Sequence, residues 1–219
     1  MQHPTSRQWY TPHMEQPRTN PVDWVGTEHL GFVINAAFSK QNTDVIMAWL
    51  EGLKKVAPEG LYAMEPEGLH ITVLDWVAPL FDYNGADKRA LYEKLHPSYD
   101  EAFRRITAGM GAFAIHFTEV RVTPGAIILV GQDAGQFQSI RSQLMDSVSL
   151  PEGGKQPPNI VHSSLARFVE PAIELAPLEE YAANNPIDIT QRVDEFRLVE
   201  TRREPMQDFD VVGTYKLAS

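Results

Sequence analysis

Two stretches of sequence decide the fold and the candidate site: LHITVL at residues 69–74 and VHSSLA at residues 161–166. Each stretch places a histidine and a hydroxyl residue, two positions apart, among apolar residues. Because side chains at positions i and i+2 of a strand point to the same face, each stretch predicts an imidazole beside a hydroxyl group. The predicted pairs are His70 with Thr72 and His162 with Ser164. A chain that contains the same histidine–hydroxyl pair twice is suited to presenting two matched groups to one substrate.

The same order of predicted elements precedes both stretches. An apolar run at 30–38 is typical of a strand buried on both faces, and apolar residues with helical spacing follow up to residue 56. Asn42 or Thr43 is the predicted N-cap of that helix. In the second copy, the apolar run at 126–130 predicts a buried strand and the pattern over 135–148 predicts a helix. A strand, a helix and a histidine strand therefore recur, although the two copies are not similar in residue identity.

The remaining segments predict further helices and strands without a clear boundary between domains. One helix or two are expected over 87–108, because Pro97 lacks the N–H group, clashes with the preceding turn and should therefore break or kink the helix. Alternating residues predict a strand at 112–118, and the end of the chain predicts a hairpin of 187–200 with 208–217. We expect an irregular arm at 1–26, followed by a single domain over 27–219.

Composition and charge exclude several classes of protein. The chain has no cysteine, which excludes disulfides, thiolate chemistry and cysteine-based zinc sites and fits a cytoplasmic protein. Its net charge of −10 argues against tracking along a long nucleic acid, but a small nucleotide or an oligonucleotide end needs only local positive groups. No apolar stretch approaches the roughly 20 residues of a membrane span, and the first 20 residues lack the apolar core of a signal peptide.

Two imidazoles and two hydroxyl groups suit hydrolysis of a phosphodiester without a metal. One imidazole can activate water and the other can protonate the leaving oxygen, because both titrate near neutral pH when unperturbed. The hydroxyl groups of Thr72 and Ser164 would donate to the phosphate oxygens on which charge accumulates. Symmetry alone does not decide which of His70 and His162 is the acid and which is the base.

The sequence resembles the 2H phosphoesterase superfamily, whose signature is two His-x-Thr/Ser motifs. The motifs here are HIT at 70–72 and HSS at 162–164, and the stretches at 31–34, 120–131 and 161–168 (GFVI, VRVTPGAIILVG and VHSSLARF) also resemble the family. This resemblance implies an α+β, bilobal fold with two pseudo-symmetric lobes of mostly antiparallel sheet, outer helices and a central cleft. It also implies metal-free cleavage of a cyclic phosphate or phosphodiester of a nucleotide or RNA end. The enzyme activity that it implies is similar to that of a 2′,3′-cyclic phosphodiesterase.

Other residues are candidates for the same cleft. By strand parity Trp76 shares the face of His70, so it either stacks a base at the rim of the cleft or is an ordinary core residue. Arg167 is odd-spaced from His162, and a regular strand would turn it away from the phosphate unless a bulge reorients it. Lys155 and Arg141 could supply local positive charge, but the sequence does not place them.

The leading interpretation is therefore a phosphoric diester hydrolase without a cofactor. The alternative is a nucleotide- or phosphate-binding module with little or no turnover. A histidine-only metal site is a weaker third reading, because two histidines without a third ligand make a poor closed site. The expected partner is a small nucleotide or an oligonucleotide end carrying a phosphate, and neither long nucleic acid nor a membrane is expected. The sequence does not indicate the oligomeric state, the physiological substrate or the position of the phosphate in the product.

Overall fold

The computed structural model describes residues 18–57, 59–169 and 172–218, so the first 17 residues of the predicted arm lie outside the described residues. The helices and strands, in chain order, are β1 (Glu28–Ala37), α1 (Lys40–Val56), β2 (Leu61–Ala63), β3 (His70–Val77), α2 (Lys88–Thr107), β4 (Phe113–Thr123), β5 (Ala126–Gln132), α3 (Gln136–Ser147), β6 (Val161–Phe168), α4 (Leu175–Asn184), β7 (Ile189–Val193), β8 (Glu195–Arg203) and β9 (Asp208–Lys216). Two short 3-10 helices precede β3 and α2, at Pro66–Gly68 and Tyr83–Gly85.

Local sequence explains where the first two helices begin, with two departures from expectation. The hydroxyl oxygen of Ser39, not Asn42 or Thr43, caps α1 by accepting a hydrogen bond from the Asn42 N–H group, so the helix begins earlier than predicted. Helix α2 continues through Pro97 as one 20-residue helix. Pro97 is exposed, so water can hydrate the helix carbonyl that proline leaves without a donor.

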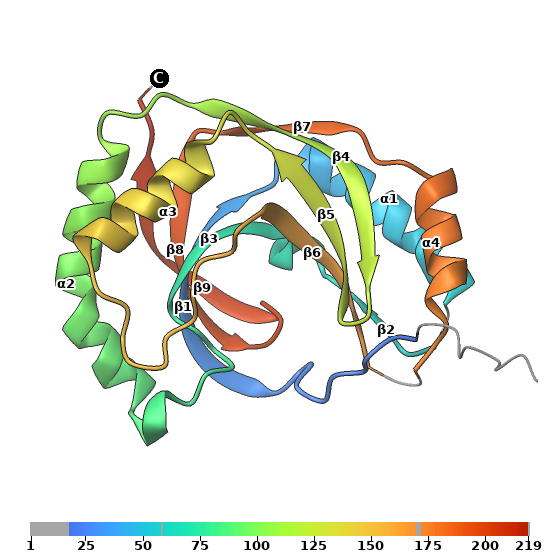
Figure 1. The fold of residues 1–219 in the computed structure, drawn as a ribbon, viewed down its shortest axis with the longest axis horizontal. Coiled ribbons are helices and arrows are strands. Elements are labelled where there is room, and N and C mark those ends of the chain that lie inside the picture. The colour runs from blue at the N-terminus through green and yellow to red at the C-terminus, as the bar shows by residue number, and fades with distance from the viewer. Residues whose placement is uncertain (1–17, 58, 170–171, 219) are drawn as a thin grey trace, which may run out of the picture.

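The strands form two antiparallel sheets, which confirms the predicted α+β fold with two lobes. One sheet has the order β3-β1-β8-β9, and the other has the order β2-β6-β5-β4-β7. Figure 1 shows the helices outside the strands, with α2 and α3 on one side of the molecule and α1 and α4 on the other. The two histidine strands, β3 and β6, belong to different sheets and contact each other where the lobes meet.

Neither sheet is built from one half of the chain alone. Strand β2 leaves the first sequence unit and pairs with β6 in the second sheet. Helix α3 of the second unit packs on β3 of the first sheet, whereas α1 of the first unit packs on β2 and β7 of the second. One hydrophobic cluster accordingly includes residues from both sheets, with Phe196 of β8 packed edge-on against Phe103 and Phe137.

Both histidine strands contain a bulge three residues after the histidine. On β3, Asn35 pairs with Thr72 and Ile34 pairs with Leu74, so the register skips Val73. On β6, the register with β5 passes from Ser164 to Ala166 and skips Leu165. A bulge adds one residue to the strand and shifts the alternation of the side chains beyond it. Residues that follow the bulge therefore reverse the face that sequence parity predicts.

The described end of the predicted arm lies against the second sheet. Main-chain N–H groups of Thr19, Asn20 and Val22 donate to the carbonyl oxygens of Ile173, Pro124 and Phe168 at 2.6–2.8 Å. These contacts lead the chain past the end of β6 and place Trp24 beside the cleft. Within the described ranges, no helix combines the length and the apolar character that crossing a membrane requires.

Candidate active site

The two histidine motifs line one cavity. His70 and Thr72 come from β3, and His162 and Ser164 come from β6. All four side chains border the same pocket, which has a volume of about 300 Å³. Residues that are far apart in the sequence are brought together because β3 and β6 are the strands that meet between the lobes. The arrangement places two imidazoles and two hydroxyl groups within one small space.

His70 has a defined tautomer in its neutral form. Its Nδ1 lies 2.7 Å from the main-chain oxygen of Gly68, and because a carbonyl oxygen only accepts, Nδ1 must donate the proton. Nε2 therefore keeps a lone pair. Burial lowers the pKa of His70 to about 4, and the Gly68 carbonyl only partly opposes this effect. The neutral ring, with a basic Nε2, is the form present at neutral pH.

The pKa of His162 is also lowered, by less than that of His70. Burial lowers the pKa of His162, the Ile160 carbonyl two residues earlier opposes the shift, and positive charges such as Arg141 and Arg167 add to it. The two imidazoles line the same cavity, and the charge of His162 contributes to lowering the pKa of His70. Two imidazoles whose pKa values are lowered to different extents are a suitable pair for acid–base chemistry.

Arg167 faces the cavity because of the bulge at Leu165. Its Nη2 donates to Ser164 Oγ at 2.9 Å, and the guanidinium carbon lies 5.6 Å from the ring centre of Trp24. Its Nε is buried and has no hydrogen-bond partner among the described residues. A regular strand would turn Arg167 away from the phosphate, and that expectation is wrong for this strand. The bulge at Leu165 reorients the side chain toward the cavity. A guanidinium group beside a hydroxyl group is a suitable binding site for a phosphate oxygen.

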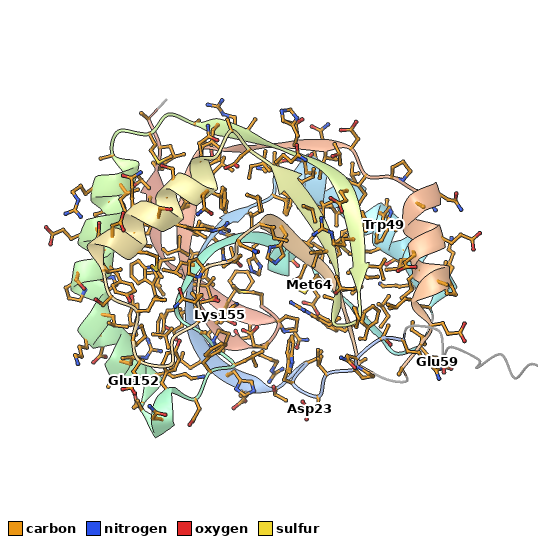
Figure 2. All side chains as sticks on the ribbon, in the orientation of Figure 1. Asp23, Trp49, Glu59, Met64, Glu152 and Lys155 are labelled. Carbon is orange, nitrogen blue, oxygen red and sulfur yellow. The ribbon has the colours of Figure 1, made fainter. Side chains whose placement is uncertain are left out.

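Asp75 faces the cavity for the same reason on the other strand. It follows the bulge at Val73, lies five residues after His70, and pairs with Lys155 (Oδ2–Nζ 2.5 Å). Lys155 comes from the loop between α3 and β6, and Figure 2 shows it near the centre of the molecule while Glu152 of the same loop lies at the periphery. Asp75 and Arg167 are equivalent positions of the two motifs and have opposite charges.

A second carboxyl group, Glu204, borders the cavity from the turn between β8 and β9. It is only 8% exposed, and its Oε1 accepts a hydrogen bond from Thr201 Oγ1 at 3.0 Å. Burial raises the pKa of Glu204 to about 7, with a further rise from the charge of Asp75. The side chain is therefore close to half-protonated at neutral pH.

The sequence matches the 2′-5′ RNA ligase superfamily over residues 45–205, a range that contains both histidine motifs. The chain belongs to this superfamily. The resemblance to the 2H phosphoesterases is thereby confirmed, and the superfamily is one of phosphodiesterases. A search of curated proteins gives no match to the sequence.

Several solved structures have a similar fold. The protein TT0787 of Thermus thermophilus superposes with a TM-score of 0.59 and 20% identity, over 85% of this chain and 97% of that one. E. coli LigT complexed with ATP gives a TM-score of 0.58 and 14% identity, over 88% of this chain and all of LigT. A conserved protein of unknown function, ATU0111 from Agrobacterium tumefaciens, gives 0.57 and 16%, over 91% of this chain and 93% of its own length. At these identities the likeness shows the fold alone.

Trp76 is not at the pocket of this superfamily member. Its side chain is 0% exposed and packs against α2, with ring centres 5.4 Å from Tyr99 and 5.8 Å from His96. The register of β3 with β1 skips Trp76, and this irregularity follows the one at Val73. Trp76 is therefore an ordinary core residue, which was the alternative interpretation. The prediction that Trp76 stacks a base at the rim of the cleft is wrong. Trp24 and Phe81 are the aromatic residues that border the cavity instead.

Arg141 links strand β3 to the residue that precedes strand β6. It is 3% exposed and donates from Nε to the oxygen of Val73 at 3.0 Å, from Nη1 to that of Ile160 at 3.2 Å and from Nη2 to that of Thr72 at 2.7 Å. Burial lowers the pKa of Arg141 to about 10, so it stays charged at neutral pH. Arg141 therefore stabilises the bulge of β3 and the entry to β6, and it is not among the residues that line the cavity.

Two further residues of the site, Asp75 and Glu204, escaped prediction for different reasons. Asp75 and Arg167 are charged residues five positions after the two histidines, and strict strand parity turns both away from the site, so this recurrence was a signal that pointed to Asp75. Nothing in the local sequence marks Glu204, because only the tertiary structure brings the β8–β9 turn to the cavity. Among the described residues, no group of three His, Asp or Glu side chains is placed to hold a metal ion.

Proposed function

We propose that this protein is a metal-independent phosphodiesterase that hydrolyses a cyclic phosphate or phosphodiester of a nucleotide or RNA end. The observation behind the proposal is that His70, Thr72, His162 and Ser164 border one cavity. Membership of the superfamily supports phosphodiester chemistry. A nucleotide as substrate is supported by E. coli LigT, which has been crystallised with ATP, 3′-AMP and NADP+.

In the proposed mechanism, His70 is the general base and His162 is the general acid. His70 keeps its Nε2 lone pair over the widest pH range, because its pKa is about 4. It takes a proton from water as the water oxygen forms a bond to phosphorus. The bond from phosphorus to the leaving oxygen breaks, and that oxygen receives the proton of His162. Thr72, Ser164 and Arg167 donate to the non-bridging oxygens while charge develops on them.

The test is an assay of the purified protein with nucleoside 2′,3′-cyclic phosphates, with and without EDTA. We expect turnover that resists EDTA, and a decrease of about 100-fold or more in kcat for both His70→Ala and His162→Ala. His116→Ala is the matched control, because His116 is exposed on β4 and outside the cavity. Loss of turnover on chelation would contradict a metal-independent mechanism.

The alternative of a binding module has its own readout. In that case 3′-AMP would bind, and no cyclic phosphate or phosphodiester would be hydrolysed at any pH between 5 and 8. Binding without turnover would therefore replace the enzyme proposal, whereas turnover in the wild type and its loss in both histidine variants would support it. Phosphorus NMR of the product would report whether the 2′- or the 3′-phosphate is formed.

A further inference from the structure

Two buried carboxyl groups border the cavity proposed to bind phosphate. Asp75 is 6% exposed and Glu204 is 8% exposed, and both line the pocket together with His70, His162 and Arg167. The two carboxyl groups line the same cavity of about 300 Å³, and the negative charge of Asp75 contributes to raising the pKa of Glu204. A carboxylate that lines a pocket repels an anion, so the presence of two carboxyl groups beside a proposed phosphate site requires a physical explanation.

The structure holds both carboxyl groups at the cavity. Asp75 is a residue of β3 and is paired with Lys155, and Glu204 is held by the hydrogen bond from Thr201, which is fully buried. Neither group can turn to solvent without breaking its contact. The carboxyl groups are therefore fixed parts of the wall, and a bound substrate meets them in place.

The residues that line the cavity include as many acids as cations. Within the described part of the chain, Lys155 and Arg167 are the cations that border the cavity, and Asp75 and Glu204 are the acids. The positive charge of Lys155 is matched by Asp75 at 2.5 Å. Both histidines are neutral in the free protein near pH 7. Arg167 is the one cation that is left for the substrate, and Glu204 stands within range of its charge.

We infer that Asp75 and Glu204 make this pocket selective for substrates with a single negative charge, and that they disfavour phosphate monoesters. This inference rests on the proposed function and specifies its substrate class. A phosphodiester has one negative charge, which Arg167 can match. A monoester has close to two at neutral pH, because its second pKa is about 6, and the second charge would meet the carboxyl groups.

The same selectivity would act on the product. Hydrolysis of the diester adds water across one P–O bond and yields a monoester, whose second ionisation creates the additional charge. Repulsion between that charge and Asp75 or Glu204 would weaken the binding of the product relative to the substrate. The two carboxyl groups are thus specificity-determining residues that also promote product release.

The test compares two ligands that differ by one charge on the same phosphorus. These are 2′-deoxyadenosine 3′-monophosphate and its methyl diester, with binding measured by calorimetry at pH 7.5 on the His162→Ala background, which keeps the ligands intact. We expect the diester to bind about tenfold more tightly. Adding Glu204→Gln or Asp75→Asn should reduce that ratio at least threefold, mainly by strengthening monoester binding. Glu67→Gln, an exposed carboxyl outside the cavity, should leave the ratio unchanged.

Every outcome decides the inference. Equal affinities, tighter monoester binding, a ratio unaffected by both substitutions or the absence of binding of either ligand would overturn it. The proposed function is judged separately, by turnover of 2′,3′-cyclic phosphates in the wild-type protein. Turnover with an unchanged binding ratio would leave the phosphodiesterase and remove the charge selection, and charge-selective binding without turnover would do the reverse.

Discussion

Arg141 donates from Nη2 to the main-chain oxygen of Thr72 at 2.7 Å, although the two residues belong to different sequence units. The same guanidinium group also holds the carbonyl oxygens of Val73 and Ile160. One buried cation therefore links the strand of the first histidine to the residues just before the second. This link joins the two halves of the site.

Replacing Arg141 should cost both stability and activity. Arg141→Met leaves three carbonyl oxygens without this donor, and we expect the free energy of unfolding to fall by about 3 kcal/mol. Arg141→Lys keeps the charge but not the three-way geometry, so kcat should fall with little change in KM. Urea unfolding and steady-state kinetics measure the two effects. Arg121→Met, at an exposed arginine of β4, is the control. Unchanged stability of Arg141→Met would contradict the role.

The pH profile of kcat/KM should fall from about pH 6 toward pH 8. The proposed general acid must be protonated, and burial lowers the pKa of His162 below 6.5 in the free protein. Its protonated fraction therefore decreases as the pH rises. Bound substrate adds a negative charge beside the imidazoles and raises both pKa values, so the profile of kcat should lie at higher pH than that of kcat/KM. A profile that rises through pH 8 would contradict the assignment.

The stability of Glu204→Gln relative to the wild type should depend on pH. The pKa of Glu204 rises from 4.5 to about 7 on folding, so the folded state binds more protons within that window. The contribution of Glu204 is therefore fully favourable below pH 4.5 and is lost as the pH rises through 7. The variant should equal the wild type near pH 4 and exceed its stability by about 3 kcal/mol at pH 8.

Urea denaturation at several pH values would test this difference. Glu179→Gln, at an exposed carboxyl of α4, controls for removal of one negative charge as such. A stability difference for Glu204→Gln that is constant from pH 4 to pH 8 would mean that the carboxyl group is not buried as the structure places it.

Substitution of Trp76 should affect mainly stability, whereas substitution of Trp24 should affect mainly KM. Trp76→Phe removes volume from the core and should lower the free energy of unfolding by about 2 kcal/mol, with KM unchanged. Trp24→Leu removes the ring that faces Arg167 at the pocket, and KM should rise about fivefold with a smaller change in stability. Kinetics and urea unfolding of both variants make the comparison. If KM rose for Trp76→Phe and not for Trp24→Leu, Trp76 would be a substrate-binding residue and the prediction would be wrong.

The sequence by itself determined those features that depend on local periodicity. Alternation along a strand pairs His70 with Thr72 and His162 with Ser164, and apolar spacing predicts the helices and strands around them. The repeated order of elements suggested that both histidine strands serve one site, and the two-lobed fold followed from the resemblance to the 2H phosphoesterases. The pairing of each histidine with its hydroxyl residue and the spacing of each helix were predictable because they depend on residues within a few positions of one another.

Only the tertiary structure decided which other side chains reach the cavity. The bulges at Val73 and Leu165 arise from pairing with neighbouring strands. Beyond each bulge the alternation of side chains is reversed, so Asp75 and Arg167 face the cavity although strand parity predicts the opposite face. For the same reason Trp76 enters the core. Glu204 comes to the cavity from the turn after β8. Arg141 does not line the cavity, but it comes from helix α3, which packs on β3, and it holds the two histidine strands together. Strand pairing and packing join residues that no local pattern connects, and such residues set the charge of the pocket.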